Sequence, residues 1–137
     1  MRLYLSGPMS SNPVDFNRPV FKAAREQLRA LGHWVLDPTE LDSLPAATAT
    51  AGPADQYKWV WIAFLIRDVA MLLSCELDGV VVLPGWRRSK GSRLEVLAAM
   101  VAGLRLYRLA VGMLYPERIN WIEVADLEPE AKEGLTT

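Results

Sequence analysis

Short apolar runs alternate along this chain with longer segments in which apolar residues recur at helical spacing. The first run, Arg2–Ser6, is rich in Leu and Tyr and stops at Gly7 and Pro8. This pattern predicts a buried strand that leads into a loop, Gly7–Asp15. Further strands are predicted at three places: His33–Leu36, Leu77–Leu83 and Tyr107–Met113. The third predicted strand, Leu77–Leu83, is apolar throughout, which is typical of a strand buried on both faces of a parallel sheet.

Three helices are predicted between these strands. The apolar residues of the first recur every three or four positions: Val20, Phe21, Ala24, Leu28 and Leu31. Asp15 or Asn17 can cap this helix, and Gly32 ends it. The other two are expected over Gln56–Ser74 and Ser92–Leu104.

Alternating strands and helices predict one three-layer α/β domain, 1–137, with helices on both faces of a central parallel sheet. The segment 43–55 has no period and is expected to be a flexible loop that could serve as a lid. The tail after 122 is poorly defined by its pattern. In such sheets ligands bind beyond the carboxyl ends of the strands. The rule selects the loops Gly7–Ser11, Asp37–Pro38 and Gly85–Ser92.

Composition narrows the classes of function. Fifteen basic and sixteen acidic residues give a net charge of −1, which argues against bulk binding to a nucleic acid polymer. A single cysteine and a single histidine exclude an internal disulfide and a Cys/His zinc site. The longest apolar run, Trp59–Ile66, is too short for a membrane span. We therefore expect a cytoplasmic protein with no metal, no cofactor and no membrane partner.

Glu95 is the first candidate for chemistry, because it lies near the start of a predicted helix that follows a buried strand. The helix dipole and the nearby Lys90 or Arg93 are expected to keep its carboxylate ionised, as a nucleophile requires. An alternative is purely structural, since Ser92-x-x-Glu95 also matches a capping box. The spacing alone leaves both interpretations open.

Asp68 interrupts the apolar face of the second predicted helix, so it is expected to be either paired or functional. An ion pair with Arg67 or Arg93 is the structural alternative. Two carboxylates that flank a glycosidic bond can divide attack and proton transfer between them. Asp68 and Glu95 form such a candidate pair.

The loop before the third helix contains cations, hydroxyls and a glycine next to a helix N-terminus. Ser89, Lys90, Gly91 and Ser92 are therefore candidates for binding a phosphate, although a solvated basic loop explains them equally well. After the first strand, the backbone of Gly7, Pro8, Met9 and Ser10 could approach a ligand.

Several segments, taken in order, resemble the nucleoside 2-deoxyribosyltransferase-like superfamily, most closely its small phage-associated branch. They are Tyr4–Met9, Asn17–Phe21, Arg67–Asp68, Cys75–Val80 and Gly91–Glu95. The resemblance implies a flavodoxin-like (Rossmann-like) fold and a reaction through a glycosyl-enzyme intermediate. It also implies a homodimer or higher homo-oligomer, in which a neighbouring chain completes the pocket.

The same resemblance implies roles for individual residues. Glu95 would be the nucleophile at C1′, and Tyr4 would orient it. Asp68 would protonate the departing base or hold it for protonation. Gly7 would let the sugar or phosphate approach the backbone.

The transferases of this superfamily have acidic residues where this chain has Ser89 and Lys90, and they end in an aromatic residue where it ends in Thr137. Relatives that hydrolyse nucleoside 5′-monophosphates place small hydroxyl residues in this loop to hold phosphate. We therefore expect an N-glycosidase that acts on a (deoxy)nucleoside 5′-monophosphate. The alternatives are a base-exchanging nucleoside 2-deoxyribosyltransferase and a nucleotide-binding or sensing domain without turnover.

Overall fold

The computed structural model describes residues 1–9, 17–41 and 54–120, and of residues 54–61 only the backbone. Four strands lie parallel: β1 (Arg2–Ser6), β2 (Trp34–Leu36), β3 (Gly79–Val82) and β4 (Arg105–Arg108). A fifth strand, β5 (Glu117–Ile119), pairs antiparallel with β4, and the order across the sheet is β2-β1-β3-β4-β5.

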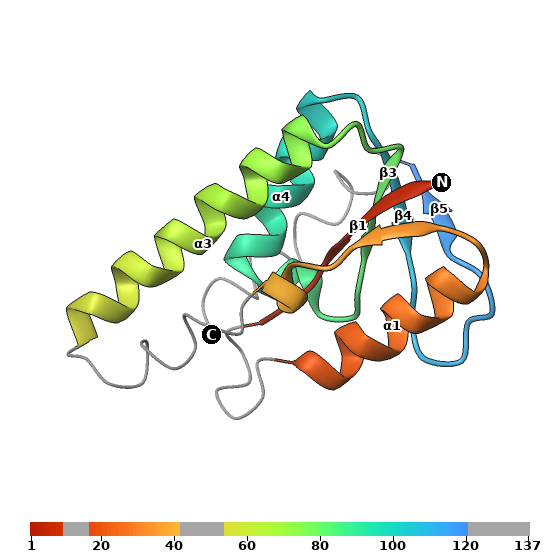
Figure 1. Cartoon of the computed structure of the whole chain (residues 1–137), viewed down its shortest axis with the longest axis horizontal. Helices are drawn as coiled ribbons and strands as arrows, with labels where there is room; N and C mark the ends of the chain where they lie inside the picture. Colours follow the sequence, from red (N-terminus) through yellow and green to blue (C-terminus); the bar gives the residue numbers. More distant parts are fainter. Residues whose placement is uncertain (10–16, 42–53, 121–137) are drawn as a thin grey trace.

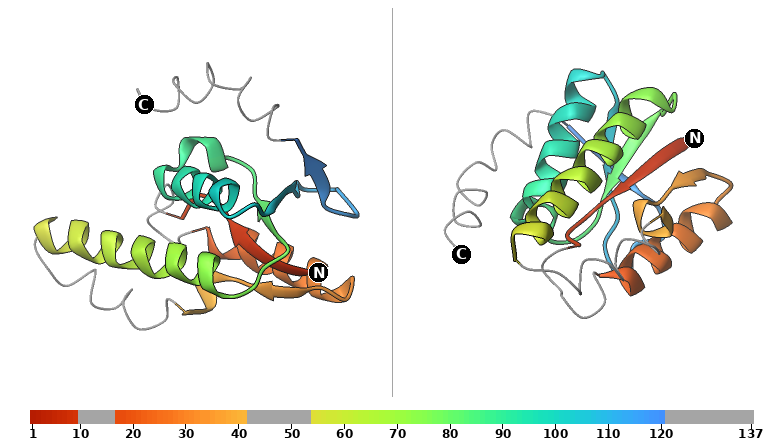
Figure 2. Two further views of the ribbon diagram at one scale, coloured as in Figure 1. Left: turned by 90° about the horizontal axis from the view of Figure 1, so that it is seen from above. Right: turned by 60° about the vertical axis from the view of Figure 1, so that its left-hand side comes forward.

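Helices cover both faces of this sheet (Figures 1 and 2). The helix α1 (Arg18–Ala30) packs on one face, and α3 (Ala54–Ser74) and α4 (Lys90–Val101) lie side by side on the other. Short 3-10 turns, η1 (Pro38–Leu41) and η2 (Trp86–Arg88), follow β2 and β3. The predicted three-layer, flavodoxin-like α/β architecture is confirmed, with an antiparallel strand added at one edge.

The core divides into two clusters because successive side chains of a strand point to opposite faces. Leu3 and Leu5 of β1 pack with α1, whereas Tyr4 packs with residues of α3 and α4. All four residues of β3 are buried, as its apolar run predicts. Gly79 is required here, since a Cβ would lie 2.8 Å from the Arg105 carbonyl oxygen of the neighbouring strand.

Several predicted boundaries were wrong. The last parallel strand occupies 105–108 rather than 107–113, because the chain turns at Ala110–Met113, where Gly112 has a positive φ of 87°. That turn returns the chain to form β5, which apolar periodicity did not predict. The helix α4 begins at Lys90, before the predicted Ser92. Asn17 is the residue that caps α1, but its side chain makes no capping hydrogen bond.

Other predictions lie outside the described residues. They concern Ser10 and Asp15, nearly all of the 43–55 loop, and the tail after 122. The loop prediction overlaps the described chain only at its end, where α3 already begins at Ala54.

Candidate active site

Buried polar side chains gather where the end of β1 meets α3 and α4. Tyr4 and Ser6 point from β1 to this face, Asp68 comes from α3, and Ser92 and Glu95 come from α4. All five are buried, although three are ionisable and the other two are serines. Burial of polar groups requires that they be paired or serve a function. The sheet therefore brings together residues that are far apart in the sequence.

The start of α4 decides between the two interpretations of Glu95. Ser89 is the N-cap, and its Oγ accepts a hydrogen bond from the Ser92 backbone N–H at 3.3 Å. Glu95 is then the sixth residue of the helix, beyond the N3 position that a capping box requires. The predicted capping box is wrong, and helix capping does not explain a glutamate at this position.

Glu95 is held by hydroxyls rather than by cations. Its Oε1 lies 3.3 Å from Ser6 Oγ, which itself lies 3.0 Å from Ser92 Oγ. Burial raises the pKa of Glu95 to about 8, an effect that the nearby Tyr4 hydroxyl and the hydrogen bond from Ser6 partly offset. The expectation that the helix dipole and Lys90 or Arg93 keep Glu95 ionised is wrong, because its pKa is raised. Only 6% of the residue is exposed, Lys90 is on the surface, and burial is the largest influence on the pKa of Glu95.

The Tyr4 hydroxyl faces the same carboxylate. The nearness of this hydroxyl lowers the pKa of Glu95. Even so, neither Tyr4 Oη nor Glu95 Oε2 makes a hydrogen bond to any of the described residues. Burial, followed by the charges of Glu95 and Asp68, raises the pKa of Tyr4 well above its usual value. Tyr4 is therefore a neutral phenol, and two buried polar atoms here have unused bonding capacity.

Asp68 is ion-paired with its chain neighbour. Arg67 donates to Asp68 Oδ1 from Nη2 at 2.7 Å and from Nε at 3.0 Å, and its guanidinium packs 5.0 Å from the ring centre of Phe64. The structural alternative of an ion pair with Arg67 is thus present. The charge of Asp68 also raises the pKa of Glu95, so the two carboxylates act on one another. An ion pair and a role in chemistry are compatible at this position.

The four loop residues predicted to bind phosphate do not share one orientation. The Ser89 hydroxyl caps α4, the Ser92 hydroxyl is buried against Ser6, and Lys90 is exposed. Gly91 is half-buried, with Leu65 Cδ1 3.9 Å from the position of a Cβ. Phosphate binding by this loop stays a prediction, for which Lys90 and the α4 N-terminus are the better placed groups.

The residues after β1 are explained largely by packing. A Cβ on Gly7 would lie 3.0 Å from Leu83 Cβ and 3.3 Å from Phe21 Cζ, so the glycine is needed between β3 and α1. Pro8 is buried, and Met9 packs against the α1-side core. The approach of a ligand to this backbone stays a prediction.

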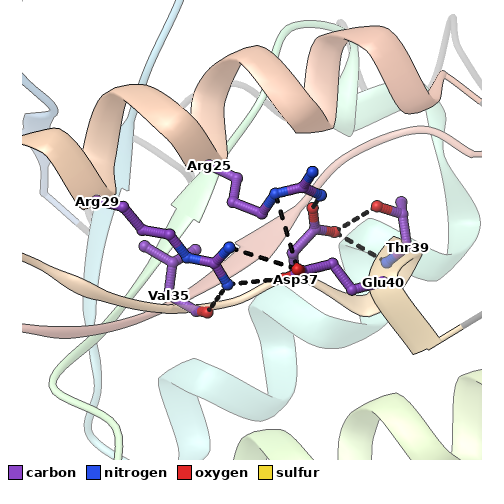
Figure 3. Close-up of polar contacts among 6 residues, drawn as sticks. All are labelled: Arg25, Arg29, Val35, Asp37, Thr39 and Glu40. Atoms are coloured by element: carbon purple, nitrogen blue, oxygen red, sulfur yellow. Dashed lines mark hydrogen bonds and ion pairs between the residues drawn. The ribbon is translucent and has the colours of Figure 1, made fainter.

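Asp37, at the end of β2, is fully engaged in holding the fold (Figure 3). Its Oδ2 lies 2.6 Å from Arg25 Nη1 of α1, and its Oδ1 accepts from the Thr39 backbone N–H at 2.8 Å and from Thr39 Oγ1 at 2.7 Å. Arg29 joins Glu40 and the Val35 carbonyl in the same network. The loop after β2 was selected as a ligand site, but Asp37 has both carboxylate oxygens occupied.

Ser6 was missed by the sequence reasoning. A usable signal existed, because a serine at the carboxyl end of a strand, two positions after Tyr4, must point to the same face as that tyrosine. Ser92, its partner on α4, was singled out by the sequence only as a helix cap and as a candidate for binding phosphate, not as a contact of Ser6.

A family model matches residues 1–108, with the description "Domain of unknown function (DUF4406)". The chain belongs to the DUF4406 family. The match contains β1 through β4 and all five buried site residues, whereas β5 lies beyond it. No curated protein and no solved structure matches the chain.

The part of the chain that the structure describes contains no group of three His, Cys, Asp or Glu side chains that could hold a metal ion. Within the same residues, no helix is both long and apolar enough to cross a membrane.

Proposed function

We propose that this DUF4406 protein is an N-glycosidase that cleaves the base–sugar bond of a (deoxy)nucleoside 5′-monophosphate. The observation that carries the proposal is the buried Glu95, whose carboxyl group lies near the Tyr4 hydroxyl and whose pKa the charge of Asp68 raises. Two interacting carboxylates with different surroundings are the arrangement that glycoside cleavage uses. The resemblance to the nucleoside 2-deoxyribosyltransferase-like superfamily supports the same chemistry.

In the proposed reaction the two carboxylates share one proton. The proton that Glu95 holds at neutral pH moves to Asp68, which leaves Glu95 as a carboxylate. Glu95 Oε2 bonds to C1′ while the C1′–N bond breaks, its electron pair goes to the base, and Asp68 protonates that base. Tyr4 stabilises the carboxylate by hydrogen bonding.

Water completes the cycle. It attacks C1′ of the glycosyl ester, its proton passes to Asp68, and the sugar phosphate leaves as Glu95 is released. The proton then returns to Glu95, so the net reaction consumes one water and yields free base and sugar phosphate. Arg67 holds the Asp68 carboxyl group in place through both steps.

The preference for a monophosphate rests on the loop that ends at the α4 N-terminus. Lys90 is exposed there, and the first backbone N–H groups of a helix attract anions. A nucleotide substrate also implies a cytoplasmic location.

The burial of Glu95 favours a second function, transfer of deoxyribose to another base. A covalent intermediate that excludes water survives longer, and an incoming base then competes better for C1′. The residues and the first half-reaction are the same.

The test is to incubate the protein with the common nucleoside 5′-monophosphates, and with the corresponding nucleosides, in the presence and absence of a second base. We expect free base and sugar phosphate from a monophosphate, whereas a new nucleoside would establish transfer instead. Glu95→Gln should abolish either product, and Ser74→Ala, an exposed serine bonded to its own helix, is the matched control. Nucleotide binding by calorimetry without any product would identify a binding or sensing domain.

We further propose that a second copy of the chain covers the outer face of α3 and α4. None of the exposed side chains in 62–74 or 94–104 is charged. The large apolar side chains exposed there are Ile66, Leu73, Leu94, Leu97, Met100 and Val101. Homodimer interfaces are more apolar than ordinary surfaces, and a symmetric pair would join this face to itself. Leu94 precedes Glu95 directly, so this interface would adjoin the site.

A further inference from the structure

Two buried serines form a hydrogen-bonded chain that ends at one oxygen of Glu95. Ser6 Oγ of β1 lies 3.3 Å from Glu95 Oε1 and 3.0 Å from Ser92 Oγ of α4, and both serines are about 1% exposed. The backbone N–H of Ser92 is bonded in turn to the cap Ser89. A short chain of hydrogen bonds therefore joins the N-terminus of α4 to the carboxyl group of its sixth residue.

The two oxygens of Glu95 are treated differently. Oε1 is bonded to Ser6, whereas Oε2 is buried without a formed hydrogen bond, as is the nearby Tyr4 hydroxyl. From this asymmetry we infer that Ser6, supported by Ser92, is a positioning residue that holds Oε1 and leaves Oε2 as the oxygen that bonds to C1′. The inference rests on the proposed function, because it names which atom of Glu95 reacts and what directs it.

The hydroxyls of Ser6 and Ser92 can form a hydrogen-bonded chain with Glu95 in both of its protonation states. A hydroxyl donates one hydrogen and accepts others. When Glu95 is protonated, it can donate to Ser6, which then donates to Ser92. When Glu95 is a carboxylate, the order reverses, and Ser92 donates to Ser6, which donates to Oε1. Ser6 thus stabilises the ionised form, in agreement with its lowering of the Glu95 pKa.

The groups whose charge or titration acts on Glu95 are Tyr4 of β1 and Asp68 and Arg67 of α3. Ser6→Ala leaves all three in place, so its effect isolates the hydroxyl. Ser92→Ala removes the second hydroxyl of the pair. If Ser6→Ala folds poorly, the titration of Glu95 in Ser92→Ala tests the inference in its place. Ser74→Ala is the control, because this exposed hydroxyl donates a hydrogen bond to the Ala70 carbonyl of its own helix.

The first measurement needs no turnover. The protein is labelled with ¹³C at its glutamate carboxyl carbons, and the titration of Glu95 is followed by NMR in the absence of substrate. The signal of Glu95 is assigned as the one that is missing from Glu95→Gln. We expect Ser6→Ala to raise the midpoint by about one pH unit, the loss of one charge-assisted hydrogen bond, with a smaller rise for Ser92→Ala. The midpoint of Ser74→Ala should equal that of the wild type. An unchanged midpoint in Ser6→Ala would overturn the inference.

The second measurement is the pH profile of kcat/KM with the best monophosphate substrate. Ser6→Ala should lower kcat about tenfold with little change in KM, because less of the shared proton reaches Asp68. A shifted midpoint with unchanged kcat would also overturn the inference. If the wild type releases no base, the proposed function fails separately, and the NMR midpoint alone decides whether the serines hold Glu95.

Discussion

Glu95 joins burial and chemistry at a single residue. Its carboxyl group lies inside the core on the α3–α4 side, and its pKa of about 8 places the change of charge just above neutral pH. The side chain of a surface glutamate would be fully ionised at neutral pH and above. The pH dependence of both activity and stability therefore reports on this residue.

The pH profile tests the shared proton. If Glu95 and Asp68 use one proton between them, kcat/KM is level below pH 8 and falls above it, about tenfold for each further pH unit. The measurement is initial rates of base release from pH 6 to 10. A rise through pH 8 would instead mean that Glu95 must lose its proton to solvent before it reacts.

Stability should show the same ionisation. Because the folded pKa of Glu95 lies near 8 and the unfolded value near 4.5, its protonation stabilises the fold fully below pH 4.5, and this contribution is lost as pH rises through 8. The loss should reach up to about 5 kcal/mol. Urea unfolding of the wild type and of Glu95→Gln across this range measures the difference, which should grow with pH in favour of Glu95→Gln. Parallel curves would show that Glu95 ionises normally.

At the scale of elements, the start of α4 sets the direction of the site. Ser89 rather than Ser92 is the cap, and Ser92 and Glu95, which follow it at three-residue intervals, contact Ser6 of β1. Ser89→Ala should lower the free energy of unfolding by about 1 kcal/mol, the usual value of an N-cap. Thermal or urea unfolding measures it against Ser74→Ala. No loss of stability would mean that the cap contributes little to the position of α4.

The network after β2 is a second element-scale device, with a structural role. Arg25 and Thr39 hold the buried Asp37, which fixes η1 against α1 (Figure 3). Asp37→Asn should cost about 3 kcal/mol, since Arg25 then loses its 2.6 Å ion pair and keeps only the longer one, from Nε to Glu40 at 3.9 Å. Glu40→Gln, at an exposed pair, should cost less than about 1 kcal/mol. Substrate turnover by folded Asp37→Asn should equal that of the wild type, and a selective loss of kcat would assign Asp37 to the site.

At the scale of the whole molecule, the face of α3 and α4 predicts self-association. Val101 is 80% exposed and Ile66 65% exposed, on neighbouring helices whose exposed side chains within 62–74 and 94–104 carry no charge. Light scattering should give the mass of a dimer or larger oligomer, and Leu97→Lys should reduce it to a monomer. Val111→Lys is the control, because this residue is 95% exposed in the turn after β4, away from both helices. A monomeric wild type at high micromolar concentration would exclude the interface.

Periodicity alone predicted much of the architecture. The strand at Gly79–Val82 was expected from an apolar run, and α1 from apolar residues three or four positions apart, because both signals are local. β5 was missed since it is three residues long and forms only through its pairing with β4. The start of α4 was misplaced because Ser89 and Ser92 are equally acceptable caps by sequence.

The sequence by itself determined the fold class and selected Asp68 and Glu95, since residue type and spacing are written in the chain, and its resemblance to a known superfamily added Tyr4. Only the tertiary structure decided what surrounds them. It made Ser6 a partner of Glu95, paired Asp68 with Arg67, and raised the pKa of Glu95 instead of keeping it ionised. The physical reason is that burial and hydrogen bonding depend on which distant elements pack together, and no local pattern contains that information.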